Sequence, residues 1–214
     1  MTNRYKSLST LVRVVSVTLV LYAVTSAIVG VLSLRMTYAL QAGLLDIIKT
    51  INSMSSWKPI GTIHTLLFLV HVVLFCFWLY RANANARALG AEGMRFSPGW
   101  AVGWLFVPIM NFFRPYQVVR EIWKASDPHA SSQWDQLPTP ALIKTWWATS
   151  LLSYFEIRLI NPSITRELVT FLMVGVAIKV LAQVVNCLLA ILLVRRIHHR
   201  QEAKAAGVLT EVGG

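Results

Sequence analysis

Long apolar stretches constrain this chain more than any other feature of its sequence. The stretches at 11–34, 60–80 and 168–194 each reach the ~20 residues that a helix needs to cross the hydrocarbon core of a bilayer. The first contains Arg13 near its start and is too long for the apolar core of a secretory signal peptide. The chain is therefore predicted to be an integral membrane protein.

The composition is typical of a chain that is partly surrounded by lipid. Apolar residues make up 56% of the 214 residues and charged residues only 14%, whereas about a quarter of the residues in soluble domains are charged. The net charge of +11 comes from basic residues that flank the apolar stretches. Because they do not gather in one patch, nucleic acid is not expected as a partner.

Shorter elements are predicted between the second and the last apolar stretch. The second helix is expected to continue past the membrane surface to Gly90, a good C-terminal cap. A helix over 98–113 would reach only about 24 Å at 1.5 Å per residue, and Pro108 interrupts it. This segment is predicted to be re-entrant or interfacial. An amphipathic helix over 115–126 and a short span over 141–157 follow.

Charge counting separates two topologies. If segment 98–113 does not cross, fourteen Lys and Arg residues lie on the cytoplasmic side and five lie outside; if it crosses, eight lie inside and eleven outside. The positive-inside rule favours the first arrangement. The predicted fold class is an all-α integral membrane protein with four transmembrane helices, a Pro-broken re-entrant or interfacial helix and an amphipathic cytoplasmic helix.

The predicted organisation places both termini in the cytoplasm. Residues 1–10 form a cytoplasmic N-terminus, and residues 201–214 form a flexible cytoplasmic tail. The single membrane domain between them covers 11–200, with spans at about 11–34, 60–80, 141–157 and 168–194.

A distinctive series of motifs follows the second span. It reads W-x-Y-R-A at 78–82, N-A-R-A-L-G at 85–90, F-S-P-G-W-A-V-G-W at 96–104, V-P-x-x-N at 107–111 and R-P-Y at 114–116. This series resembles the signature of a bacterial family of multi-pass membrane domains of unknown function. The resemblance covers roughly Trp57 to Arg196 and implies a bacterial cytoplasmic (inner) membrane location. It brings no activity, substrate or cofactor.

Polar residues of this motif block form the first candidate site. Pairing of Arg81 or Arg114 with Glu121, while amides bind the backbone freed at Pro108, would make a structural clamp on the re-entrant element. The alternative is a cytoplasm-facing pocket for an anionic group such as a lipid phosphate. The candidate residues are Arg81, Asn85, Asn111, Arg114 and Glu121. The aromatic residues expected at the membrane interface are Trp78, Trp100, Trp104 and Trp123.

A line of polar residues inside the apolar stretches forms the second candidate site. His64 and His71 lie seven residues apart on the second span, and Lys179 and Asn186 lie seven apart on the last. Counting from the inner helix ends places His64 at the depth of Lys179, and His71 at the depth of Asn186. Two interpretations stay open: an ion or proton path, or polar contacts that join two helices.

Enzymatic signatures such as GxSxG, HExxH and GxxxxGK[ST] do not occur in the sequence. Catalysis, a metal and a cofactor are therefore not expected. The sequence predicts a non-enzymatic membrane domain that binds lipid or protein through its cytoplasmic motif block, with a small transporter or channel as the alternative. The expected partners are membrane lipids, including anionic lipid at the cytoplasmic face, and a second copy or another membrane protein.

Overall fold

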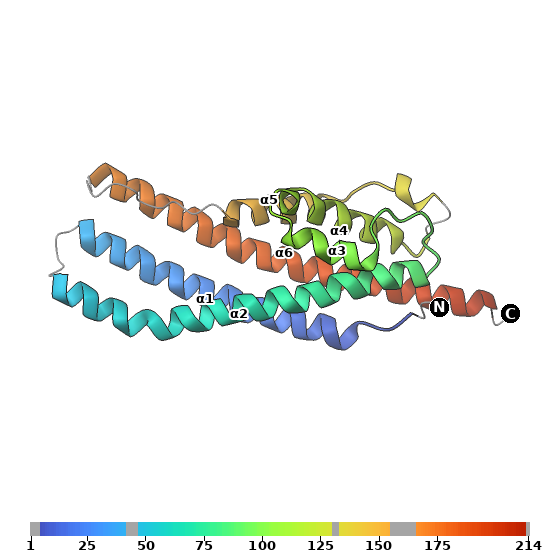
Figure 1. Cartoon of the computed structure of the whole chain (residues 1–214), viewed down its shortest axis with the longest axis horizontal. Helices are drawn as coiled ribbons and strands as arrows, with labels where there is room; N and C mark the ends of the chain where they lie inside the picture. Colours follow the sequence, from blue (N-terminus) through green and yellow to red (C-terminus); the bar gives the residue numbers. More distant parts are fainter. Residues whose placement is uncertain (1–4, 42–46, 130–132, 155–165, 213–214) are drawn as a thin grey trace. The chain divides into compact units, whose positions relative to one another are not determined.

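The computed structural model describes residues 5–41, 47–129, 133–154 and 166–212 (Figure 1). Within these ranges the chain forms helices and no strand, so the predicted all-α fold is confirmed. The α-helices are α1 (Ser9–Gln41), α2 (Ile47–Ala88), α3 (Pro98–Gly103), α4 (Arg114–Ala125), α5 (Ala141–Tyr154) and α6 (Arg166–Val212). The 3-10 turns are η1 (Trp104–Phe106), η2 (Met110–Phe112) and η3 (Trp134–Gln136).

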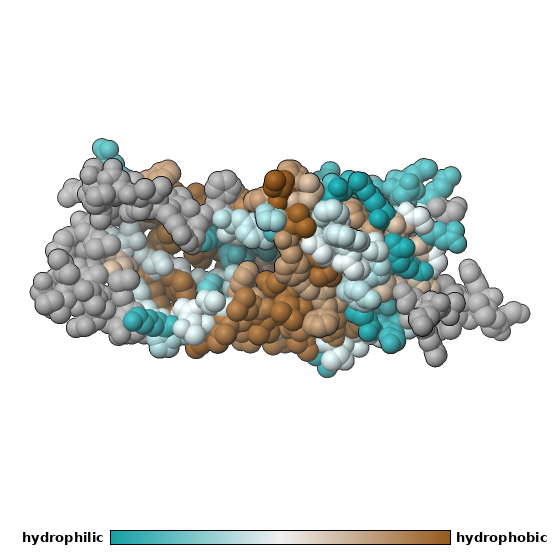
Figure 2. Space-filling view, in the orientation of Figure 1, coloured by the Kyte–Doolittle hydropathy of each residue, from teal (hydrophilic) through white to brown (hydrophobic). Residues whose placement is uncertain are grey.

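Three of the described helices are long and apolar enough to cross a membrane. The candidate spans are Ser9–Tyr38 in α1, Trp57–Ala88 in α2 and Thr170–Gly207 in α6. Large apolar side chains on these helices stay exposed, and apolar residues gather in a broad patch on the face drawn in Figure 2. Such a surface suits contact with hydrocarbon, because proteins surrounded by water rarely expose a large apolar patch.

The predicted fourth span is not among these three. α5 has 14 residues, which corresponds to about 21 Å of helix. The last residues of the predicted span at 141–157 lie outside the described residues. α6 continues to Val212, through the residues from 201 onward that were predicted to form a flexible tail.

The segment over 98–113 is not one helix. α3 has six residues and is capped by the preceding Ser97, whose Oγ accepts a hydrogen bond from the Trp100 N–H at 3.4 Å. After η1, Val107 adopts an extended conformation with φ −93° and ψ 109°, as expected for a residue that precedes proline. The predicted break at Pro108 is therefore present, and the helical part ends earlier than predicted.

The chain divides into two compact units. The first comprises Met1–Val17, Val72–Trp147 and Leu189–Gly214, and the second comprises Thr18–His71 and Ala148–Leu188. The motif block lies wholly in the first unit. There, α4 is amphipathic as predicted: its buried face includes Val118, Val119 and Ile122, while Arg120 is exposed.

In the second unit, α1 approaches α6 closely at Gly30. A Cβ atom at Gly30 would overlap the side chain of Val180, so this position needs a glycine. Thr25 and Ser33 on the same helix donate their hydroxyl groups to carbonyl oxygens one turn earlier. Their polar atoms are thus satisfied within the apolar segment, as a membrane-embedded helix requires.

Candidate functional site

The loop between α2 and α3 turns at two glycines with left-handed backbone conformations. Gly90 has φ 84° and Gly93 has φ 70°, values that favour glycine over any residue with a Cβ atom. The Ala91 N–H donates to the Ala86 carbonyl at 3.1 Å, which closes the end of α2. Gly90 is thus the C-terminal cap that the sequence predicted.

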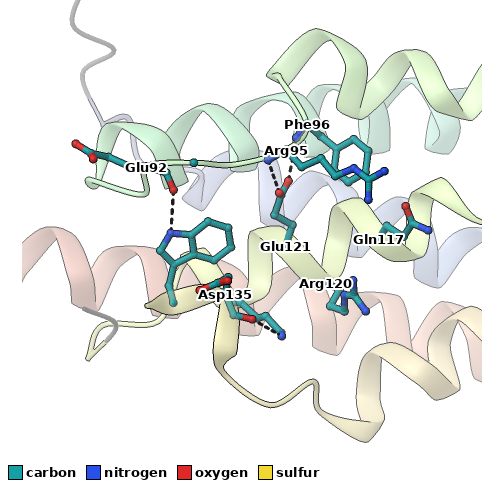
Figure 3. A pocket seen from close by; sticks show the side chains of 10 residues that line it. Glu92, Arg95, Phe96, Gln117, Arg120, Glu121 and Asp135 are labelled. Atoms are coloured by element: carbon teal, nitrogen blue, oxygen red, sulfur yellow. Dashed lines mark hydrogen bonds between the residues drawn. The ribbon is translucent and has the colours of Figure 1, made fainter. Parts of the chain in front are cut away.

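Side chains hold this loop from two sides at Phe96. From α2, Asn83 Nδ2 donates to the Phe96 carbonyl at 3.0 Å, and Arg87 Nη2 donates to the same oxygen at 3.0 Å. From α4, the Glu121 carboxylate accepts the N–H of Arg95 at 2.5 Å and that of Phe96 at 3.2 Å (Figure 3). Both the N–H and the carbonyl group of Phe96 are therefore held by hydrogen bonds. We call Asn83, Arg87 and Glu121 the loop clamp.

The loop clamp differs from the predicted one in its partners. Glu121 accepts backbone N–H groups instead of pairing with Arg81 or Arg114, and Arg114 Nη1 donates to Gln117 Oε1 at 2.9 Å. Arg81 is half-buried and makes no ion pair within the described part of the chain. The Asn111 N–H donates to the Val107 carbonyl at 2.8 Å in the turn around Pro108.

Two clamp residues, Asn83 and Arg87, were missed by the sequence analysis. They lie four residues apart on α2, and Arg87 Nε donates to Asn83 Oδ1 at 3.3 Å. The available signal was their spacing within the motif N-A-N-A-R, which puts both on one face of the helix. Burial raises the pKa of the Glu121 carboxyl group above its ordinary value. The two backbone N–H groups and the nearby Arg87 and Arg95 charges lower that pKa without cancelling the rise.

Asn85 binds a different backbone segment from the one predicted. Its Oδ1 accepts the Lys6 N–H at 3.2 Å, and its Nδ2 donates to the Lys6 carbonyl at 2.8 Å. The same Nδ2 lies 3.4 Å from Gln201 Oε1 on α6. Gln201 is fully buried and donates to the Ala82 carbonyl at 2.8 Å and to Ser126 Oγ at 3.0 Å. We call this set the helix-end junction, since it joins the residues before α1 to the C-terminal ends of α2 and α4 and to the C-terminal part of α6.

An arginine-rich aromatic pocket lies beside the loop clamp. The Arg114 Cζ lies 5.7 Å from the ring centroid of Phe96 and 5.1 Å from that of Trp104, while the Arg95 Cζ lies 5.4 Å from that of Phe96. Together with Ser97 and Trp100, these residues line a pocket of about 440 Å³. Both charged groups on this wall are cationic, so the pocket suits an anion.

A neighbouring open pocket of about 450 Å³ carries both signs of charge (Figure 3). Its cationic residues are Arg95, Arg120 and Lys124, and its acidic residues are Glu92, Glu121 and Asp135. Lys124 Nζ donates to the Asp135 carbonyl at 2.8 Å. Because the charges balance, this pocket has no comparable preference for an anion.

The predicted interface tryptophans divide into buried and exposed ones. Trp78 is fully buried and packs on Phe75 with ring centroids 5.3 Å apart. Trp123 is buried beneath Arg200, whose Cζ lies 4.5 Å from its ring centroid. The prediction is wrong for these two, because packing inside the first unit covers them. Trp100 is exposed, and its ring centroid lies 4.9 Å from that of the half-buried Trp104.

Residues 49–200 match the family described as a domain of unknown function, DUF4328. The chain belongs to the DUF4328 family. No curated protein and no solved structure matches the chain. The DUF4328 region contains the whole loop clamp and the arginine-rich aromatic pocket, whereas Lys6 and Gln201 of the helix-end junction lie outside it. The resemblance to a family of unknown function is confirmed.

The second candidate site of this DUF4328 chain lies in the second unit. The Tyr22 ring of α1 stacks on His64, with centroids 4.8 Å apart, and on His71, with centroids 6.2 Å apart. Thr25 Oγ1 lies 3.3 Å from His64 Nδ1. Both histidines therefore contact α1. The predicted contact between α2 and α6 stays a prediction.

The fourth member of the line, Asn186 on α6, contacts α5. Its Nδ2 donates to Ser150 Oγ at 2.6 Å and to Thr149 Oγ1 at 3.2 Å. Among the described residues, no group of three or more His, Cys, Asp or Glu side chains could hold a metal ion. These contacts of His64 and His71 are thus with α1, and those of Asn186 are with α5; an ion or proton path stays a prediction.

Proposed function

We propose that this DUF4328 chain is a non-enzymatic membrane domain that binds anionic lipid through its motif block. The observation that carries the proposal is a row of exposed apolar side chains next to the arginine-rich aromatic pocket. We call this row the apolar ridge, and its members are Trp100, Phe106, Ile109, Phe112 and Phe113. Their exposed fractions run from 50% for Phe112 to 70% for Ile109, which suits contact with hydrocarbon rather than water.

The apolar ridge begins and ends at the loop clamp. Phe96, which precedes the ridge, is bonded to Glu121, which follows it. A segment tied in this way leaves and returns at one place, which supports the re-entrant or interfacial interpretation over a fifth crossing. Its backbone also closes local hydrogen bonds, including Phe113 N–H to the Met110 carbonyl at 3.0 Å. Such bonds are needed by irregular backbone that contacts lipid.

Four crossings explain the helix directions in the first unit. The helix-end junction joins Lys6, before α1, to the C-terminal end of α2 and to the C-terminal part of α6, through Asn85 and Gln201. If all three helices cross, α2 and α6 run in the same direction, and the chain between them must return. We assign this return to the predicted span that begins with α5, which gives the fourth crossing.

The same arrangement puts both termini on one side of the membrane. By the positive-inside rule this is the cytoplasmic side, because Arg195, Arg196 and Arg200 follow directly after the predicted span at 168–194. The proposed location is the bacterial cytoplasmic membrane. The arginine-rich aromatic pocket and the apolar ridge would then face the inner leaflet, where anionic lipids attract cations by about 1 kcal/mol per Lys or Arg.

Lipid analysis after gentle detergent extraction tests the proposal. The purified chain should carry anionic lipid at a higher mole fraction than the membrane from which it came. A Phe106→Ser/Ile109→Ser variant removes the two most exposed members of the ridge and should lower this enrichment, with unchanged thermal unfolding. Equal lipid composition in protein and membrane would reject lipid binding. A stoichiometric protein in the same preparation would support a protein partner instead.

A small transporter or channel is the second candidate. The stacking of Tyr22 on His64 and His71 inside the apolar segments supports it, since intramembrane ionisable residues often mark ion pathways. Proton flux into liposomes that contain the purified chain tests this function. Flux that is lost in a His64→Ala/His71→Ala variant would favour transport over lipid binding.

A further inference from the structure

Two guanidinium groups converge on one aromatic ring in the arginine-rich aromatic pocket. The Cζ atoms of Arg95 and Arg114 lie 5.4 and 5.7 Å from the ring centroid of Phe96. Both cations line the same pocket, where like charges disfavour each other. A bound anion would remove this repulsion.

The wall that carries the cations is rigid. Phe96 is buried, and the loop clamp bonds both its N–H and its carbonyl group. Arg114 is half-buried, stacks on Trp104 and donates to Gln117. Arg114 therefore has little side-chain freedom left for a ligand to remove, which lowers the entropy lost on binding.

Neither guanidinium group donates a hydrogen bond to a carboxylate in the described part of the chain. Glu121 interacts electrostatically with the Arg95 side chain. However, its two oxygens already accept the backbone N–H groups of Arg95 and Phe96. Arg114 has no acid at hydrogen-bonding distance, so it is the less compensated of the two cations.

We propose that this pocket binds the phosphate monoester headgroup of a membrane lipid of the phosphatidic acid type, in preference to a phosphate diester. This assignment rests on the proposed lipid binding and names its ligand. A phosphate monoester carries between −1.5 and −2 charges near pH 7 and offers three terminal oxygens. It can therefore neutralise both guanidinium groups and accept the paired N–H donors that each presents.

The aromatic lining selects a lipid over a soluble phosphate ester. Trp100 and Trp104 line the same pocket as the cations, with Trp104 against Arg114, and the exposed Trp100 is also a member of the apolar ridge. Indole rings favour the level of the lipid headgroups, where one side is apolar and the other wet. The phosphate would lie on Arg95 and Arg114 while the glycerol and acyl part follows the tryptophans outward.

The test uses the full-length chain in nanodiscs of phosphatidylcholine that contain equal amounts of phosphatidic acid and phosphatidylglycerol. Native mass spectrometry reports which lipid stays bound. We expect phosphatidic acid to exceed phosphatidylglycerol by about fivefold, as one additional charge interaction near a membrane surface predicts. Arg114→Gln should abolish this preference, and Arg95→Gln should reduce it less.

The matched control is Arg120→Gln, which removes one charge from an exposed position on α4 outside the pocket. It should keep the fivefold preference. Should Arg114→Gln fail to fold, Arg95→Gln carries the test, because the backbone of Arg95 and not its side chain bonds to Glu121. Unchanged preference in both pocket variants would overturn the assignment.

Two further outcomes distinguish this inference from the proposed function. Equal retention of both anionic lipids overturns the monoester preference and leaves anionic lipid binding intact, whereas retention of neither overturns both. Glycerol 3-phosphate is the probe for a soluble ligand. Displacement of bound phosphatidic acid by glycerol 3-phosphate at an equal concentration would overturn the choice of a lipid; the absence of displacement supports it.

Discussion

The substitution Asn85→Ala tests the helix-end junction, and its effect can be worked out from three hydrogen bonds. Two of them join the amide group to the Lys6 N–H and carbonyl, at 3.2 and 2.8 Å. The Lys6 backbone is partly exposed, so water replaces these bonds and their loss costs about 1 kcal/mol each. The third, at 3.4 Å, reaches Gln201 Oε1, which water cannot reach because Gln201 is fully buried. Leaving that acceptor unpaired costs about 1–3 kcal/mol.

Hydrogen exchange distinguishes the local loss of the Lys6 bonds from the effect on global unfolding. The Lys6 amide loses about 2 kcal/mol of local protection, which predicts about 30-fold faster exchange. Global unfolding in mixed micelles should become easier by about 3–5 kcal/mol when all three bonds are lost. The matched control is Asn83→Ala, an equally buried amide two residues earlier that bonds to Phe96. It should leave Lys6 exchange unchanged. Equal Lys6 exchange in Asn85→Ala and the unmodified chain would refute the reasoning.

Two other predictions concern charge and packing. Burial raises the folded-state pKa of Glu121 above its ordinary value of 4.5. The folded chain therefore binds a proton at Glu121 more readily than the unfolded chain does. The stability that this proton contributes is fully present below pH 4.5 and is lost as the pH rises through the folded-state pKa. Glu121→Gln should remove that slope in a pH series of thermal unfolding, and a persistent slope would assign it to another group. Gly30→Val should lower the free energy of unfolding by about 1–3 kcal/mol, because the new side chain overlaps Val180. Gly61→Ala is the neutral control, since the added Cβ meets open space there. Equal losses of stability in the two variants would contradict a specific clash at Gly30.

Local signals in the sequence predicted the helices and their ends well. The apolar stretches predicted α1, α2 and α6, since each contains a candidate span. Gly90 and Pro108 predicted a helix end and a helix break, because each acts on the backbone at its own position. Helix lengths were underestimated: α6 continues through a polar segment to Val212. Hydropathy detects only the part of a helix that suits lipid, so a polar extension escapes it.

The partners of the polar residues could not be predicted to the same degree. Glu121 was identified as a clamp residue, but an arginine was expected as its partner, since opposite charge is the simplest local criterion. The structure gives it two backbone N–H groups instead. Backbone donors occur at every residue other than proline, so nothing in the letters of the sequence distinguishes Arg95 and Phe96 as donors. Trp78 was likewise assigned to the interface because residue type alone does not report burial.

The helix-end junction shows why part of a site can lie outside a family's recognisable region. Lys6 contributes only its N–H and carbonyl groups to Asn85, so any residue except proline could serve there, and no side-chain pattern would mark the position. Gln201 differs, because its amide donates to Ala82 and Ser126 and lies against Asn85. A Gln201→Glu variant would keep the side-chain shape but lose both donors and bury a charge. Its destabilisation should therefore exceed that of any substitution at Lys6 other than proline, and a smaller effect at Gln201 would show that the junction does not depend on its amide.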